Sequence, residues 1–423
     1  MDRLHLILER YFGHTAFNPY QEEIIRDLLA GRDVLAVLAT GGGKSLCYQV
    51  PALMGDGVAL VISPLIALMK DQVDDLQARG IGAEALNTAC SYATTRRVLA
   101  DLEENLVQVL YVSPEKAVGE DFLALAASLP ITLIAVDEAH CISMWGHQFR
   151  PEYRSLAVLK ERFPAVPMVA LTATATPDVR EDIVRQLHLA EPSVYVGSFN
   201  RENLRYAVVP KGEDAYGQLR DLLRRRREDA GIVYAATRGG TETLASRLRA
   251  DGIPALPYHA GMAAAARAET QDRFIRGKVG LICATSAFGM GIDKPDVRFV
   301  VHYDMPKTLE AYYQESGRAG RDGELSDCIL FYHDDDAKRL RSLIDRDLPS
   351  EFQREVARAK LQSMVDYCTA GGCRRERILA YFGERYDSLP CGGCDACVPD
   401  RPAGKARTRS GNRKRRAVRP ASG

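Results

Sequence analysis

The sequence has few of the features that mark membrane, secreted or repeat proteins. Its stretches without a charged residue, such as 122–136, are shorter than the about 20 apolar residues that a membrane-spanning helix needs. The first residues lack the basic stretch and apolar core of a secretion signal. Tryptophan occurs once, and no segment repeats at the periods of solenoid or propeller folds. We therefore expect a cytoplasmic protein without a membrane partner.

Charge and cysteine are distributed unevenly along the 423 residues. Lys plus Arg and Asp plus Glu both number 56, but 401–423 hold nine of the basic residues and no acidic residue. This tail is predicted to be disordered and to bind nucleic-acid phosphates, with a solubilising or protein-docking tail as the alternative. Five of the ten cysteines lie within 368–397, which favours a metal site over disulfides in a reducing compartment.

Short apolar segments alternate with amphipathic ones along most of the chain. Buried parallel strands are predicted at 34–38, 58–63, 109–112, 133–136 and 168–171, and then at 231–234, 255–258, 279–284, 297–302 and 327–332. The fold class is therefore α/β, with two parallel-sheet lobes in tandem. Residues 197–205 are the predicted hinge, and 338–367 have apolar residues at helical spacing.

A glycine-rich turn follows the first predicted strand. It consists of Thr40, Gly41, Gly42, Gly43, Lys44 and Ser45. A strand, a glycine loop and a helix together predict a phosphate site, with Lys44 on the β and γ oxygens and Ser45 on Mg²⁺. The strict pattern has glycine where this chain has Leu38, so a tight turn without a ligand is the alternative.

Two carboxylates, Asp137 and Glu138, follow the apolar segment 131–136. The carboxyl ends of parallel strands are where open α/β sheets bind ligands. Asp137 is therefore predicted to hold Mg²⁺, and Glu138 to orient or deprotonate an attacking water. Together with the Lys44 loop, this pair predicts nucleoside triphosphate hydrolysis.

Several longer motifs resemble those of the RecQ family of superfamily 2 DNA helicases. They stand in family order between Phe17 and Cys397 and include SPLIALMKDQV (63–73), CISMWGHQFRPEY (141–153), ALTATA (170–175), ATSAFGMGIDKP (284–295) and YYQESGRAGRDG (312–323). The resemblance implies two RecA-like lobes (1–199 and 200–337), a small helical zinc-binding module (338–400) and the basic tail (401–423). It also implies ATP, Mg²⁺ and Zn²⁺ as cofactors, and DNA, single-stranded or as a 3′-tailed duplex, as the partner.

The resemblance assigns roles to individual residues as well. Gln314, Arg318 and Arg321 of the second lobe would complete the catalytic set, with Arg321 favoured as the residue that stabilises the transferred phosphoryl group. Such arginines accelerate hydrolysis by about 10³–10⁵-fold. Because the two halves of the site lie on different lobes, hydrolysis would require closure of the cleft. By family position, further nucleotide-binding residues are His14, Gln21, Gly291 and Asp293.

DNA contacts are expected across both lobes. By family position the candidates are Ser63, Lys70, Ser113, His140, Thr172, Thr237, His259 and Thr285, although hydroxyls at strand ends more often cap turns. The loop 141–150 follows the carboxylates directly, so base stacking there could be relayed to Glu138. Its candidate residues are Trp145, His147, Phe149 and Arg150. A tryptophan buried in the core is the alternative.

The chain departs from the family pattern ahead of the phosphate loop and in the aromatic loop. Relatives usually carry an aromatic residue, an arginine and a glutamine where this chain has His14, Asn18 and Gln21. This difference predicts weaker ATP binding or relaxed base selectivity. In the aromatic loop, Gln148 stands where the family commonly has an acid, which leaves Arg150 without its expected partner.

The residues after Cys397 are too few for the winged-helix and accessory domains of longer family members. Strand separation is therefore expected to depend on the two lobes, the zinc module, the tail or a partner.

Four cysteines have the spacing of a metal site. Cys391, Cys394 and Cys397 are each three residues apart, and Cys373 precedes a helix predicted at 374–381. Four thiolates suit tetrahedral Zn²⁺, which would attach that helix to a glycine-rich turn. An iron–sulfur cluster and unligated thiols are the alternatives, and Cys368 is predicted to be a core residue.

These features predict an ATP-dependent DNA helicase that moves 3′ to 5′ on single-stranded DNA, in DNA repair or recombination at the nucleoid. Single-strand-binding or repair proteins are its candidate protein partners. One alternative is a DNA-stimulated ATPase that translocates but unwinds poorly. Another is a DNA-annealing or scaffold protein regulated by ATP, and the intact catalytic set argues against it.

Overall fold

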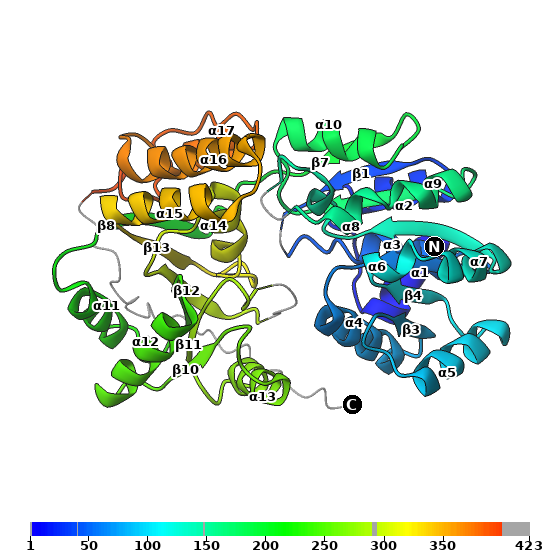
Figure 1. Cartoon of the computed structure of the whole chain (residues 1–423), viewed down its shortest axis with the longest axis horizontal. Helices are drawn as coiled ribbons and strands as arrows, with labels where there is room; N and C mark the ends of the chain where they lie inside the picture. The colour runs from blue at the N-terminus through cyan, green and yellow to red at the C-terminus, as the bar shows by residue number, and fades with distance from the viewer. Residues whose placement is uncertain (1, 40, 147–148, 290–293, 400–423) are drawn as a thin grey trace, which may run out of the picture.

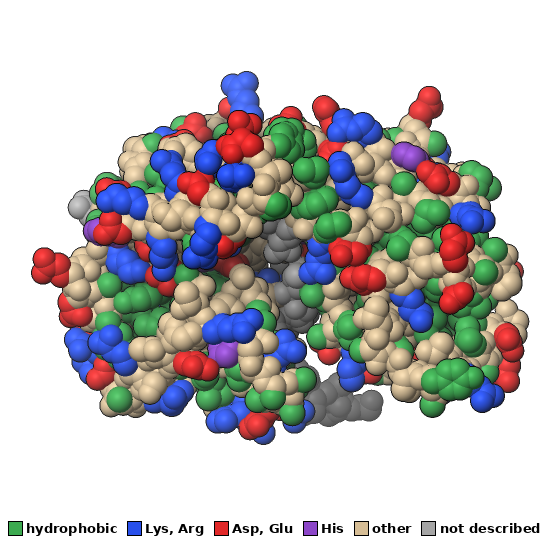
Figure 2. Space-filling view, in the orientation of Figure 1, with side chains coloured by type: hydrophobic (Ala, Val, Ile, Leu, Met, Phe, Trp, Pro, Cys, Tyr) green, Lys and Arg blue, Asp and Glu red, His purple; other side chains and the backbone are tan. Residues whose placement is uncertain are grey.

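A computed structural model describes residues 2–39, 41–146, 149–289 and 294–399. Two α/β lobes lie side by side, and a helical module lies along one end of the second lobe, next to the first (Figure 1). Figure 2 shows a hollow between the lobes, on a face where acidic and basic side chains are interspersed. None of the helices in the described ranges combines the length and the apolar character needed to cross a membrane.

The first lobe is built on a parallel sheet, which has seven strands in the described part of the chain, in the order β3-β4-β2-β5-β6-β1-β7. The strands are β1 (Val34–Val37), β2 (Val58–Ile62), β3 (Ala83–Leu86), β4 (Val109–Val112), β5 (Ile131–Val136), β6 (Met168–Thr172) and β7 (Ser193–Val196). Alternate residues of β1 enter two separate apolar clusters, Val34 and Ala36 on one face and Leu35 and Val37 on the other. Helices therefore cover both faces, which explains the continuously apolar strand sequences.

The helical segments of the first lobe connect these strands. They are α1 (Arg3–Ile7), the π-helix η1 (Leu8–Phe12), α2 (Gln21–Leu29), α3 (Leu46–Ala52), α4 (Ile66–Ala78), α5 (Tyr92–Glu103), α6 (Pro114–Ala117), α7 (Glu120–Ser128), the 3-10 helix η2 (Ala139–Ile142), α8 (Pro151–Arg154), α9 (Ala157–Arg162) and α10 (Pro177–Gln186).

The second lobe has a parallel sheet of six strands within the described ranges, in the order β10-β11-β9-β12-β13-β8. Its strands are β8 (Leu204–Pro210), β9 (Ala230–Tyr234), β10 (Ala255–Tyr258), β11 (Leu281–Ala284), β12 (Val297–His302) and β13 (Ser326–Tyr332). Its helices are α11 (Ala215–Arg224), α12 (Arg238–Ala250), α13 (Ala264–Ile275) and α14 (Leu309–Ser316). In both lobes the connections place the carboxyl ends of neighbouring strands at one edge of the sheet, where the candidate site residues lie.

The helical module consists of α15 (Asp334–Asp347), α16 (Glu351–Thr369) and α17 (Arg374–Tyr381), followed by the cysteine-bearing turn. A buried ion pair between Lys360 of α16 and Glu310 of α14 attaches it to the second lobe. The turn also extends the sheet edge, because the amide of Tyr206 in β8 donates to the carbonyl of Gly393 at 3.0 Å. The module is thus packed onto the edge strand of the second sheet.

Every strand predicted from the sequence is present, with small differences at the ends. Three strands were not predicted, namely β3, β7 and β8, and two of them, β3 and β7, are edge strands of the first sheet. Edge strands have fewer buried positions and lack a continuous apolar run, so their sequences are less distinctive. The predicted hinge at 197–205 was wrong at its end, because β8 begins at Leu204.

Candidate nucleotide site and metal centre

The glycine loop lies between β1 and α3, as the sequence predicted. Gly41 and Gly43 have φ angles of 83° and 72°, a left-handed conformation that residues with a Cβ atom rarely adopt. The amide of Gly42 donates to the Ala39 carbonyl at 2.9 Å, which closes the turn. The backbone amide of Gln49 donates to the Ser45 carbonyl at 2.9 Å, so helical hydrogen bonding begins directly after the loop. Thr40 lies outside the described residues.

Gln21, the first residue of α2, supports the glycine loop from behind. Its side-chain nitrogen donates to the carbonyls of Gly43 at 2.9 Å and Gly42 at 3.3 Å. Its side-chain oxygen accepts a hydrogen bond from the backbone N–H of Asn18 at 2.8 Å. A Cβ atom added to Gly43 would lie 2.4 Å from the Gln21 nitrogen. His14 is exposed at the surface. The structure therefore brings Gln21 and Asn18 to the loop and shows no such contact for His14.

Asp137 and Glu138 lie at the carboxyl end of β5, next to the glycine loop. The Glu138 backbone has a φ of 49°, a strained conformation for a residue other than glycine, and its amide donates to the Asp137 carboxylate at 2.9 Å. Burial and the neighbouring charge of Glu138 together raise the pKa of Asp137 to about 7, although the positive charge of Lys44 opposes this rise. A divalent cation bound there would favour the ionised carboxylates, because its charge dominates the local field.

Charged side chains from both lobes affect the pKa of Glu138. Burial raises its pKa, whereas the positive charges of Lys44, Arg318 and Arg150 lower it. Its carboxylate lies 3.3 Å from Nδ1 of His140, and the same nitrogen lies 2.9 Å from the Thr172 hydroxyl at the end of β6. His140 and Thr172 are fully buried, so in this conformation they contact the carboxylate site and not the surface.

The arginines of the second lobe reach the glycine loop and the carboxylates. Arg318 is buried, donates to the Gly289 carbonyl, and is close enough to Glu138 to lower its pKa. The Cγ atom of Arg321 lies 3.8 Å from the position that a Cβ atom on Gly41 would take. Both arginines, which are far from the loop in sequence, therefore lie at the predicted nucleotide site. Gln314 is buried on α14, whereas Gly291 and Asp293 lie outside the described residues.

Two serines predicted to contact DNA lie at the carboxyl edge of the first sheet. Ser63 follows β2 and Ser113 follows β4, which are neighbouring strands. Both side chains are buried, and their hydroxyl oxygens have no hydrogen-bond partner among the described residues. Lys70 on α4 is exposed and pairs with Asp74 one turn later.

The corresponding residues of the second lobe lie at the carboxyl ends of β9, β10 and β11. The Thr237 hydroxyl accepts the Gly240 amide at 3.0 Å and caps α12. His259 is buried, with its Nε2 atom 3.0 Å from Glu242. The Thr285 hydroxyl accepts the Ala287 amide at 3.4 Å. Thr237 therefore has a structural role as the N-cap of α12, whether or not it also contacts DNA.

The aromatic loop places Trp145 at the surface, with 43% of the residue exposed. Its ring meets Phe352 of α16 edge to face, with centroids 5.2 Å apart, so the alternative of a core tryptophan is wrong. Arg150 donates to the Pro64 carbonyl at 3.3 Å and lies near Glu138, so it has partners despite the missing acid. Phe149 lies 5.8 Å from the guanidinium of Arg154, whereas His147 and Gln148 lie outside the described residues.

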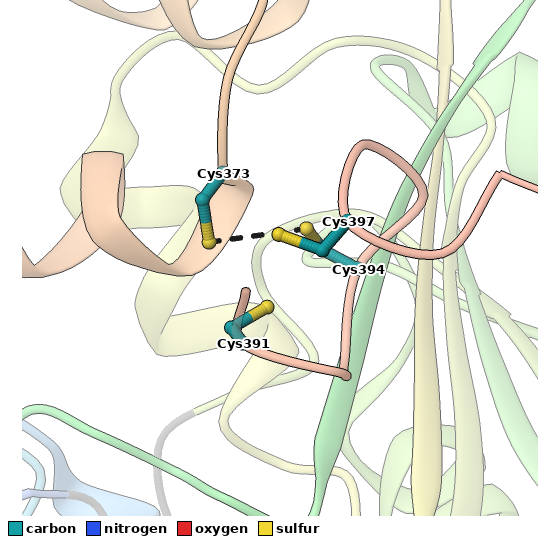
Figure 3. A group of neighbouring side chains, drawn as sticks. All are labelled: Cys373, Cys391, Cys394 and Cys397. Atoms are coloured by element: carbon teal, nitrogen blue, oxygen red, sulfur yellow. Dashed lines mark hydrogen bonds between the residues drawn. The ribbon is translucent and has the colours of Figure 1, made fainter. Parts of the chain in front are cut away.

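The four predicted metal ligands form one cluster (Figure 3). The sulfur atoms of Cys373, Cys391, Cys394 and Cys397 all lie within 4.8 Å of one another, and those of Cys373 and Cys394 are 3.9 Å apart. Tetrahedral zinc with 2.3 Å bonds places its sulfurs about 3.8 Å apart, so this donor set fits one zinc ion. Cys368 is buried on α16, as predicted for a core residue.

Sequence reasoning missed the side chains that attach the segment between the lobes, residues 197–203, to its surroundings. The ring of Phe199 stacks on Phe382 of the module with centroids 4.4 Å apart, and Arg180 of α10 donates to the Phe382 carbonyl at 2.6 Å. The Glu384 carboxylate accepts the Phe199 amide at 2.6 Å. Arg201 makes further contacts of this kind with backbone carbonyls. Such contacts have no sequence signature, because every residue has a carbonyl group.

Comparison with known proteins agrees with this architecture. The family model of the DEAD/DEAH box helicase matches 18–183, that of the helicase conserved C-terminal domain matches 214–323, and that of the RecQ zinc-binding region matches 334–398. ATP-dependent DNA helicase RecQ of Bacillus subtilis is 44% identical over 406 residues, which are 95% of this chain and 68% of that protein. The chain belongs to the RecQ family.

Other RecQ relatives are longer than this chain. ATP-dependent DNA helicase RecQ of Pasteurella multocida is 45% identical over 392 residues, and the match covers 93% of this chain and 62% of that relative. Among solved structures, the DEAD-box helicase Mss116 bound to ssRNA has a TM-score of 0.66 at 18% identity, covering 84% of this chain and 80% of that one. The DUF1998 helicase MrfA bound to DNA has a TM-score of 0.66 at 16% identity, covering 91% and 59%. These two likenesses show the two-lobed fold.

Proposed function

We propose that this RecQ-family chain is an ATP-dependent DNA helicase that moves 3′ to 5′ along single-stranded DNA. One observation carries the proposal: Arg321 of the second lobe lies against Gly41 of the glycine loop, and Arg318 lies near Glu138. A hydrolytic site with one half on each lobe changes its geometry whenever the lobes move. Nucleotide turnover is therefore coupled to the relative movement of two DNA-binding surfaces.

In the proposed reaction, bound ATP with Mg²⁺ supplies the phosphoanhydride bond that is broken. Lys44 would neutralise the terminal phosphates, and Ser45 and Asp137 would hold the cation. Glu138 would orient the attacking water and accept its proton as the water oxygen bonds to the γ-phosphorus and ADP leaves; burial, which raises the pKa of this carboxylate, and its contact with His140 suit this role. Arg318 and Arg321 stabilise the charge that develops on the transferred group.

DNA is proposed to run across the carboxyl edges of both sheets, where the relevant hydroxyls lie. Trp145 is well placed to couple DNA binding to hydrolysis. Its ring is exposed, and only the short helix η2 and two further residues separate it from Glu138. Stacking of a base on an aromatic ring contributes about 1–3 kcal/mol and does not depend on sequence. This placement supports DNA-stimulated hydrolysis.

The cysteine cluster is proposed to hold Zn²⁺ in a structural role. Four sulfur ligands leave no open coordination position for a substrate. Cys373 precedes α17 and the other three cysteines belong to the turn that pairs with β8, so zinc would join these elements. Purified protein should therefore be colourless and contain one zinc per chain, whereas a brown protein absorbing visible light would indicate an iron–sulfur cluster.

The proposed place of action is the cytoplasm, at nucleoid DNA, in repair or recombination. The ten cysteines are all free of disulfides, which is typical of a reducing compartment. Single-strand-binding or repair proteins are the proposed partners.

The test combines an ATPase assay, with and without single-stranded DNA, and strand displacement on duplexes with a 3′ or a 5′ tail. The proposal expects DNA-stimulated hydrolysis and displacement of the 3′-tailed duplex alone. Stimulated hydrolysis without displacement would instead support a translocase, and annealing without hydrolysis would support a scaffold protein. Lys44→Ala is the control that should lose hydrolysis while keeping DNA binding. Comparing ATP with other nucleoside triphosphates tests whether His14 and Asn18 relax base selectivity.

A further inference from the structure

Arg201, in the segment between the two lobes, contacts the loop that carries Arg318 and Arg321. Its guanidinium donates to three backbone carbonyls of that loop, those of Gly317 at 3.2 Å, Ala319 at 3.0 Å and Gly320 at 3.0 Å. A planar guanidinium presents five donors in a fixed arrangement, which suits several converging carbonyls better than a lysine ammonium does. One side chain therefore sets the path of the backbone between the two catalytic arginines.

Asn203 holds the same peptide from a second direction. Its side-chain nitrogen donates to the carbonyls of Gly320 at 2.7 Å and Glu324 at 3.0 Å. Gly320 has a φ of 56°, and its amide donates to the Val297 carbonyl at 2.8 Å. A Cβ atom on Gly320 would lie 2.4 Å from the Asn203 nitrogen, so the fit requires glycine. Gly320, the residue before Arg321, is thus held at both its amide and its carbonyl group.

These contacts satisfy groups that the helix itself leaves unpaired. α14 ends at Ser316, and the last carbonyls of a helix and those just beyond it have no intrahelical donors. A cation at this end of a helix is also favourable, because the helix dipole is negative there. Without Arg201, these carbonyls would have to find water or other donors, and the loop would lose its fixed path.

We propose that Arg201 and Asn203 are positioning residues for hydrolysis: they hold the loop so that Arg318 and Arg321 reach the nucleotide site of the other lobe. The inference rests on the proposed roles of those two arginines. Catalytic groups must lie close to their productive positions, and a displacement of about 1 Å can lower the rate about 10²-fold. Arg201 and Asn203 act through the loop and do not themselves touch the nucleotide.

The same segment is held on its other side by the metal-binding module. Arg375, two residues after Cys373, donates to the side-chain oxygen of Asn200 at 2.5 Å and to the carbonyls of Arg201 and Leu204, both at 2.7 Å. Contacts therefore run from the cysteine cluster through Arg375 and Arg201 to the loop that carries Arg318 and Arg321. The module is placed to influence the rate of hydrolysis without contacting ATP.

The test measures ATP turnover at saturating DNA for Arg201→Ala, beside the affinity for a fluorescent ADP and for ADP with aluminium fluoride, a transition-state analogue. We expect kcat to fall about 10-fold to 10²-fold, with KM and ADP affinity within about twofold of the unchanged protein. Affinity for ADP with aluminium fluoride should fall by the same factor as kcat, because only that complex resembles the transition state. Arg249→Ala is the control. Like Arg201, Arg249 donates to a backbone carbonyl, that of Ala255 at 2.8 Å, but Arg249 lies on α12 and not between the lobes.

Further variants separate positioning from a general loss of structure. Asn203→Ala should repeat the effect more weakly, and Arg201→Lys should retain the charge but recover only part of kcat. These two variants also keep the inference testable if Arg201→Ala does not fold. Equal weakening of ADP and of the analogue would overturn the inference, because it would indicate a disturbed nucleotide site.

Arg321→Ala distinguishes this inference from the proposed function on which it rests. If both Arg318→Ala and Arg321→Ala retain full turnover, the proposed roles of these arginines fail and the positioning inference fails with them. If Arg321→Ala loses turnover while Arg201→Ala keeps it, the positioning inference alone is overturned. Arg201→Ala should cause no further loss of turnover when it is added to the Arg318→Ala/Arg321→Ala double variant, because Arg201 acts through the two groups already removed; a multiplied loss would contradict that relation.

Discussion

Replacing Arg375 with alanine should loosen the metal-binding module from the segment between the lobes. The Arg375 residue is only 3% exposed, and three of its hydrogen bonds to that segment are 2.7 Å or shorter. The acceptors are the side chain of Asn200 and the carbonyls of Arg201 and Leu204. Removing the guanidinium leaves buried acceptors without donors, which costs more than the loss of a solvent-exposed contact.

The expected magnitude follows from these bonds. A hydrogen bond to a charged group contributes about 1.5–3 kcal/mol, so three bonds at the lower value contribute about 4.5 kcal/mol. Water entering the vacated space would satisfy some of the acceptors. We therefore expect Arg375→Ala to lower the free energy of unfolding of the module by about 3 kcal/mol.

Urea unfolding of zinc-loaded protein measures this change with two signals. A chromogenic chelator reports zinc release from the module. The fluorescence of Trp145, the only tryptophan, reports separation of the module from the first lobe, because its ring lies 5.2 Å from that of Phe352 on α16. Arg377→Ala is the matched control: Arg377 lies on the same helix and donates to the Gly371 carbonyl, but does not contact the segment between the lobes. Its effect should stay within about 0.5 kcal/mol.

The comparison of the two variants decides the outcome. If Arg375→Ala releases zinc at the same urea concentration as Arg377→Ala, the buried guanidinium does not hold the module and the reasoning from its hydrogen bonds is refuted. Arg375→Lys should recover part of the loss, because lysine keeps the charge but cannot reach several carbonyls at once.

Four other outcomes are expected. Trp145→Ala should lower the stimulation of ATPase by DNA more than the basal rate, and an equal loss of both would indicate a purely structural role. Cys394→Ser should abolish stoichiometric zinc and make the module protease-sensitive, since structural zinc contributes about 10–16 kcal/mol of apparent binding energy; a resistant, zinc-free protein would contradict this. Because the pKa of Asp137 is raised to about 7, lowering the pH from about 7 to about 6 should weaken Mg²⁺ binding roughly fivefold, as one proton competes with the cation; calorimetry showing an unchanged affinity would refute it. Deleting 401–423 should lower the slope of log DNA affinity against log salt by roughly three units if the tail engages about four phosphates, while an unchanged slope would indicate another role.

The sequence by itself was enough to predict the two sheets, the glycine loop and the cysteine cluster. Each depends on a few residues that are close together in the chain. Central strands are apolar on both faces, Gly41 and Gly43 permit left-handed backbone, and Cys391, Cys394 and Cys397 are spaced so that one ion can bind all three. The requirement is local in each case, so adjacent residues carry the signal.

Membership of the RecQ family could also be predicted, because long motifs agree with the family in identity and order. These motifs implied that Arg318 and Arg321 would serve a site whose other half begins near Gly41. Their contact with the first lobe nevertheless depends on how the two lobes are placed. That placement is a property of the whole fold and of the segment that joins the lobes.

Only the tertiary structure decided how that placement is maintained. Arg201 and Arg375 bind backbone carbonyls, and Asn203 binds the carbonyl of a glycine more than a hundred residues away in the chain. A carbonyl group is present at every position, so neither the donor nor its acceptor can be recognised from residue type or spacing. The sequence therefore determined which groups carry the chemistry, and hydrogen bonds from side chains to backbone carbonyls far away in the chain determined how those groups are held together.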